Sequence, residues 1–169
     1  MSIATDILPE FKYEMSSTRK VLERVPEEHA LWKPHPKSRS LGDLANHVAT
    51  TPAFVAVALT LDEFDFADAN VENFSREFTS RTALLEVFER NAAATLSAIA
   101  ETSDEEFKKP WTLKNQGRLV FTLPRTAVLR SFVMNHLIHH RGQLTVYLRL
   151  KEVPLPAIYG SSADEQMKR

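Results

Sequence analysis

Residues 125–151 read RTAVLRSFVMNHLIHHRGQLTVYLRLK, which is the longest regular apolar pattern in the chain. On a helix that turns about 100° per residue, one narrow sector of this segment collects apolar and aromatic side chains together with two histidines. The members of the sector are Leu129, Val133, His136, His140 and Tyr147, with Leu144 beside them. Because Pro154 and Pro156 follow, the spacing predicts a single long helix over 125–151 whose buried face carries two histidines.

Three earlier segments, at residues 4–25, 40–59 and 80–101, also place apolar residues three and four apart, as amphipathic helices do. Ser40, followed three positions later by Asp43, is a typical cap for the second of these helices. Pro52 lies inside the same helix and lacks the N–H that would bond to the carbonyl of Val48, so we expect a kink there. Residues 60–79 are acidic with scattered phenylalanines, and we expect a loop with one short helical turn.

The segment before the last helix differs in kind. Residues 109–124 read KPWTLKNQGRLVFTLP, in which two short apolar or β-branched runs flank the turn-forming residues Asn115, Gln116 and Gly117. This pattern is typical of a small hairpin or an extended excursion. At 169 residues the chain is long enough for one domain. We therefore predict an all-α protein in which residues 1–169 form one four-helix bundle with a short β-hairpin-like insertion before the last helix.

Composition excludes several classes of function. A net charge of -1, with lysine and arginine spread along the chain, lacks the basic surface that nucleic acid requires, so we expect no nucleic-acid partner. No apolar run is long enough to span a membrane, and the first residues, MSIATDILPEFKYE, do not resemble a secretory signal, so we expect a cytoplasmic protein. The chain has no cysteine, which excludes disulfides, zinc–thiolate sites and a thiol nucleophile of its own.

The histidines suggest a metal site. His136 and His140 are one helical turn apart and can meet the same ion, whereas His139 lies about 80° away from their sector. His47 borders the apolar stripe of the second helix and is the natural third ligand. Three imidazoles suit divalent zinc, nickel or iron and leave positions for water or substrate. A histidine pair with this spacing also occurs as ordinary core or surface histidine. Two histidines near the proline-rich connection are expected at the surface: His29 and His35.

Other polar residues are weaker candidates for the metal site, and we assign no catalytic residue. Asp43 is one turn before His47 but is better explained as part of the helix cap. Gln143 and Tyr147 could point toward the histidines, whereas Arg141 is expected to be a solvent or interface charge. Tyr159 could close over a pocket if the carboxyl-terminal segment folds back.

The chain resembles the DinB-like family (the DinB/YfiT superfamily of metalloenzymes) in SRSLGDLANHVA, residues 38–49, and NHLIHHRGQLTVYLRLKEVPLPAIYG, residues 135–160. The resemblance covers nearly the whole chain, including PWTLKNQGRLVFTLPR at residues 110–125. It implies a four-helix bundle in up-down-down-up order, commonly a homodimer, with a divalent metal on three histidines. By position these are His47, His136 and His140.

Related families resemble transferases and isomerases that activate a small thiol, such as bacillithiol, mycothiol or glutathione, at the metal. A divalent ion can generate a thiolate or hydroxide at neutral pH, which suits a chain without cysteine. We therefore expect a metal-dependent enzyme, either a thiol S-transferase acting on a small electrophile or a hydrolase. Two alternatives stay open: a non-catalytic, stress-associated metal-binding module, and a metal-free helical interaction protein.

Overall fold

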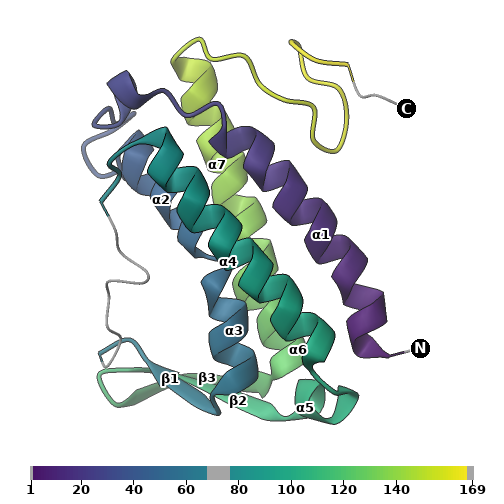
Figure 1. The fold of residues 1–169 in the computed structure, drawn as a ribbon. Coiled ribbons are helices and arrows are strands. Elements are labelled where there is room, and N and C mark those ends of the chain that lie inside the picture. Colours follow the sequence, from purple (N-terminus) through teal and green to yellow (C-terminus); the bar gives the residue numbers. More distant parts are fainter. Residues whose placement is uncertain (1, 68–76, 167–169) are drawn as a thin grey trace.

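The computed structural model describes residues 2–67 and 77–166, which are mostly helical with a small sheet at one end (Figure 1). The longer helices lie side by side, and strands cross below α3 and α6 in the view of Figure 1. The helices are α1 (Ile3–Leu22), α2 (Leu41–Thr50), α3 (Ala53–Thr60), α4 (Arg81–Glu101), α5 (Asp104–Lys108), α6 (Arg125–Ala127) and α7 (Asn135–Leu150), with a 3-10 turn, η1 (Glu27–His29), and a π-helical segment, η3 (Val128–Met134). The strands are β1 (Glu63–Asp65), β2 (Pro110–Asn115) and β3 (Arg118–Pro124).

Serine side chains cap the starts of α2 and α4, as the sequence predicts for α2. The Ser40 hydroxyl accepts a hydrogen bond from the backbone N–H of Asp43 at 3.1 Å. Ser80 caps α4 in the same way through the N–H of Ala83, also at 3.1 Å. Each cap satisfies one of the N–H groups that a helix start leaves without a partner.

Pro52 divides the second predicted helix into α2 and α3, where we expected a kink in one helix. Side chains of α4 donate hydrogen bonds to backbone carbonyls at the break. The Asn91 amide donates to the carbonyl of Ala49 at 3.2 Å, and the Thr95 hydroxyl donates to the carbonyl of Pro52 at 2.7 Å. The break is therefore held from outside the helix, by its neighbour.

The last predicted helix is not uniformly α-helical, which corrects the expectation of one regular helix. Residues Val128–Met134 are π-helical, between α6 and α7. A π turn bonds each N–H five residues back instead of four, and such segments are often found at functional sites. The apolar pattern cannot reveal it because apolar spacing reports which residues share a face and not the register of the backbone hydrogen bonds. His136 lies just beyond its end.

The predicted hairpin is present and has a third strand. β2 and β3 pair antiparallel, and their turn uses positive φ at Gln116 (53°) and Gly117 (74°). β1 pairs parallel with β2, with Phe64 opposite Leu113. The expectation of a loop with a helical turn was therefore wrong for residues 63–65, because strand pairing with a segment far along the chain decides their structure. Residues 68–76 of that region lie outside the described residues.

Across the described part of the chain, the structure has no helix with the length and apolar character needed to cross a membrane.

Gly42 marks a close approach in the first turn of α2. A Cβ atom there would lie 2.9 Å from Cβ of Phe78 and 3.1 Å from the carbonyl oxygen of Ala30. We expect Gly42→Ala to lower the free energy of unfolding by about 1–3 kcal/mol, because backbone must move. Gly142→Ala is the matched control, since a Cβ at that helical position meets no atom within 4 Å.

In urea unfolding, Gly142→Ala should be neutral or stabilising by up to about 1 kcal/mol, because alanine favours a helix more than glycine does. Equal stability of the Gly42→Ala variant and the unmodified protein would contradict the close approach.

Candidate metal centre

Two packed helices bring the three predicted histidines together. His47 comes from α2, and His136 and His140 come from successive turns of α7. All three side chains are half-buried, and one nitrogen of each lies within 4.8 Å of the others. Nε2 of His47 and Nε2 of His136 are 3.1 Å apart. Two ligands of one tetrahedral ion, each about 2.0–2.1 Å from it, would be about 3.3 Å apart. The group could therefore hold a metal ion with little rearrangement.

The surroundings keep all three imidazoles neutral. Burial, followed by the positive charge of Arg39, lowers the pKa of His47 from 6.5 to about 3. Burial is also the main cause that lowers the pKa values of His136 and His140, and Arg39 contributes to both. Because only a neutral imidazole has a lone pair to offer, these shifts favour metal binding at neutral pH.

Two ligand candidates are oriented by neighbouring groups. Nδ1 of His140 is 2.7 Å from Oε1 of Gln143, so a proton on Nδ1 would leave Nε2 free for an ion. His136 hydrogen-bonds to the backbone of Phe132, and this bond raises its pKa, as an acceptor carbonyl does. Contacts of this kind set the tautomer and orientation of metal-binding histidines. Gln143 therefore supports the site from beside it.

The remaining sequence candidates are outside the three-histidine group. Tyr147 packs edge-on against Trp32, with ring centroids 5.7 Å apart. His139 is exposed, and its ring centroid is 4.9 Å from that of His140. Asp43 is exposed, and its backbone N–H makes the cap with Ser40. Two further histidines lie on or near the surface, half-buried and exposed respectively: His29 and His35.

Arg141 is buried, so the expectation of a solvent or interface charge was wrong. Only 2% of its side chain is exposed, and it forms an ion pair with Glu14 of α1 at 2.7 Å. The carboxyl-terminal segment does fold back, but the Tyr159 hydroxyl bonds to Glu14 and Arg141, not to a histidine. The sequence does not reveal this, because the partner carboxylate is 127 residues away in the chain.

Arg39 is a site residue that the sequence analysis missed. It is exposed, and its charge acts on all three histidines. It lies in the connection just before the Ser40 cap, where no periodicity assigns a direction to the side chain.

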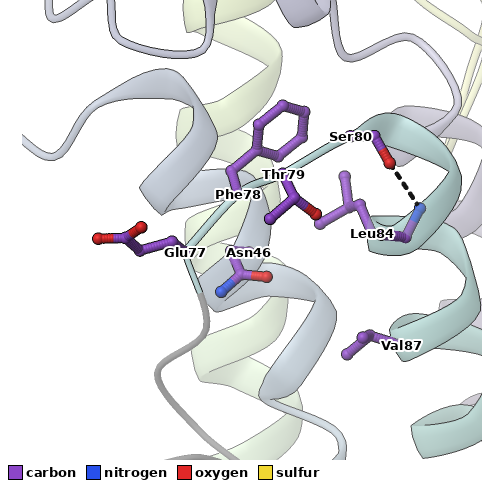
Figure 2. Close-up of a pocket in the computed structure, with 8 residues that line it drawn as sticks. Asn46, Glu77, Phe78, Thr79, Ser80, Leu84 and Val87 are labelled. Atoms are coloured by element: carbon purple, nitrogen blue, oxygen red, sulfur yellow. Dashed lines mark hydrogen bonds between the residues drawn. The ribbon is translucent and has the colours of Figure 1, made fainter.

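A separate cavity of about 420 Å³ lies between α2 and the start of α4 (Figure 2). Phe78, Leu84 and Val87 line it together with Asn46, and none of the three histidines does. We do not assign the chemistry to it, because apart from Asn46 and Glu77 its side chains offer no charged or metal-binding group.

A family model described as the DinB family matches residues 1–168. The chain belongs to the DinB family. The chain is also similar to the uncharacterized protein YrdA of Bacillus subtilis (strain 168). The two are 26% identical over 165 residues, which cover 95% of this chain and 90% of YrdA.

Two solved structures share the DinB-like fold. The DinB-like protein YjoA of Bacillus subtilis has a TM-score of 0.70 at 20% identity, over 96% of this chain and 99% of YjoA. A DinB-like protein of Bacillus cereus ATCC 10987 has a TM-score of 0.71 at 22% identity, over 94% of this chain and 98% of its own. At this level of identity the similarity shows the fold alone.

The lowered pKa of His47 predicts how the metal-free DinB-family protein responds to acid. The pKa of His47 is about 3 in the folded protein, against 6.5 for a free histidine. Below pH 6.5 the unfolded chain therefore binds a proton at His47 that the folded protein does not bind. The free energy of unfolding should therefore fall as the pH falls from about 6.5 toward 3, by at most about 1.4 kcal/mol per pH unit for this group.

Urea titrations of chelator-treated protein at several pH values measure how the free energy of unfolding depends on pH. His47→Asn should make the dependence on pH shallower, because it removes this titrating group. An equal dependence of the free energy of unfolding on pH in the His47→Asn variant and the unmodified protein would contradict the prediction.

Proposed function

We propose that His47, His136 and His140 bind one divalent ion, and that the loaded protein is an enzyme that transfers a small thiol, or adds water, to a small electrophile. The convergence of three neutral imidazole nitrogens from two helices carries this proposal. When bound, the ion would lower the pKa of a coordinated thiol or water and so supply a nucleophile at neutral pH. Zinc, nickel and iron all suit the three nitrogens.

The chain's own residues have supporting roles. Gln143 would hold His140 with Nε2 available to the ion, and the backbone of Phe132 would do the same for His136. Arg39 would attract an anionic thiol such as glutathione to the site, because its positive charge reaches all three histidines. No cysteine of the chain can serve as nucleophile, so the thiol comes from a small molecule.

Turnover of a chromogenic electrophile tests the enzyme. Protein purified without a histidine tag, loaded with zinc or nickel, should consume chlorodinitrobenzene with at least one of glutathione, bacillithiol or mycothiol. In that reaction a carbon–sulfur bond forms, chloride leaves and the thiol proton passes to buffer. If neither this panel nor a panel of hydrolysable esters gave a metal-dependent rate, the enzyme proposal would fail.

A non-catalytic metal-binding module is the second candidate, because an ion on these ligands would link α2 to α7. For this function, chelation should lower the melting temperature, while no member of either panel is consumed. The two candidates share the metal and differ in turnover.

We also propose that the helices form a four-helix bundle in up-down-down-up order. In this description α2 with α3, and α6 with η3 and α7, each form one bent helix. The backbone supports it, since Thr51 and Pro52 keep right-handed helical angles through the first break. Val128 and Asn135 do so at both ends of η3.

We further propose a cytoplasmic homodimer. The exposed side of α7 presents Val146 and Leu150, which are 57% and 56% exposed, one turn apart. Burial of such side chains favours association of two copies. Light scattering should give twice the chain mass of 19.2 kDa, and a monomeric mass at micromolar concentration would contradict the proposal.

A further inference from the structure

Five phenylalanine rings form one connected cluster at the sheet end of the molecule. They are Phe54 of α3, Phe64 and Phe66 in and after β1, Phe121 of β3 and Phe132 of η3, and we call them the phenylalanine cluster. Phe54 is central, with ring centroids 5.6 Å from Phe64, 6.2 Å from Phe66 and 5.7 Å from Phe132. Phe121 extends the cluster from Phe132 at 5.5 Å.

The cluster is continuous with the three-histidine group. The Phe132 ring packs edge-on against the His136 ring, with centroids 6.1 Å apart. Phe132 lies four residues before His136, and Phe54 lies seven residues after His47. The contact between Phe54 and Phe132 links α3 to η3. It is therefore close in the sequence to the contact between His47 and His136, which links α2 to α7.

The rings of the cluster are not fully withdrawn into the core. Phe66 is 42% exposed, and the other four rings are only partly buried. Contiguous apolar side chains that remain in contact with solvent commonly mark a ligand surface. Small-molecule sites typically combine such side chains with a few polar groups that fix the reacting atoms. Here the histidines would be those groups, with Arg39 and Gln143 as the other polar residues beside them.

We infer that the electrophilic substrate carries an aromatic or similarly apolar group, which rests on the phenylalanine cluster while its reactive carbon lies at the three histidines. This inference rests on the proposed function and names the substrate class of the same site. Phe54 and Phe132 are the residues that would select the apolar group, because Phe132 packs against His136 and Phe54 packs against Phe132. Offset or edge-on contact between rings would favour an aromatic group over an alkyl group of equal size.

A pair of metal-binding probes that are not turned over tests the inference by calorimetry. Acetohydroxamate and benzohydroxamate present the same chelating group and differ by methyl against phenyl. Zinc-loaded protein should bind benzohydroxamate at least about tenfold more tightly, after correction for the affinities of the two probes for free zinc. Phe54→Ala should reduce this ratio to within about threefold.

Two further variants keep the test decisive. Phe66→Ser changes an exposed ring, so the fold should persist, and the ratio should fall by a smaller factor. Leu119→Ala is the matched control, because Leu119 is an apolar residue of the same sheet, 66% exposed, with no part in the cluster. It should leave the ratio unchanged.

The outcomes separate this inference from the proposed function. Equal affinity of the two probes, or a ratio that survives both phenylalanine substitutions, would overturn the substrate class and leave the metal site standing. If neither probe bound the zinc-treated protein, the proposed open metal site would fail, and this inference with it.

Discussion

Protein with His136→Ala should lose both its bound metal and any metal-dependent turnover. Nε2 of His136 is 3.1 Å from Nε2 of His47, and the His136 ring lies 4.6 Å from that of His140, so its removal leaves only two of the three imidazoles as candidate ligands. Loss of a group that only orients a ligand costs about 10–100-fold in metal affinity, and loss of a ligand should cost more. Elemental analysis should find about one metal per chain in the unmodified protein and far less in the variant.

His139→Ala is the matched control for this prediction. His139 lies on the same helix and next to a proposed ligand, but it is exposed and outside the three-histidine group. Metal content and turnover should stay close to those of the unmodified protein. Equal losses in the two variants would mean that the histidines of α7 act through charge or folding, and the assignment of His136 as a ligand would be wrong.

Glu14→Ala should lower the free energy of unfolding by about 3–5 kcal/mol, because it leaves a buried arginine without its counter-charge. The carboxylate and guanidinium of Glu14 and Arg141 are 2.7 Å apart, with side chains 6% and 2% exposed. The Tyr159 hydroxyl donates to the Glu14 carboxylate and lies 2.9 Å from each oxygen, so the carboxyl-terminal segment would also lose one of its contacts with α1. Urea unfolding followed by circular dichroism measures the change.

An exposed ion pair provides the control. Glu10→Ala breaks the contact with Arg130, whose side chain is 53% exposed, and should cost less than about 1 kcal/mol. The double variant Glu14→Leu with Arg141→Met should recover much of the loss, because it removes both buried charges. If Glu14→Ala were no more harmful than Glu10→Ala, the buried pair would not contribute as described.

Local features of the sequence predicted most of the helices and the hairpin. Apolar spacing placed α1, α4 and α7, Ser40 marked the start of α2, and Pro52 marked a break, because each depends on residues within a few positions of one another. The turn at Gln116 and Gly117 is local for the same reason. Helical spacing alone also put His136 and His140 on one face and set His139 aside.

The tertiary structure decided everything that depends on pairing between distant segments. His47 meets His136 across 89 residues, and the resemblance to a known family, not spacing, supported that contact beforehand. Likewise β1 is a strand because β2 pairs with it, Arg141 is buried because Glu14 receives it, and Phe54 joins Phe132 through the packing of α3 on η3. Sequence periodicity reports which side of an element is apolar, whereas the partner of that side, and with it the chemistry of the site, is set only when the elements pack.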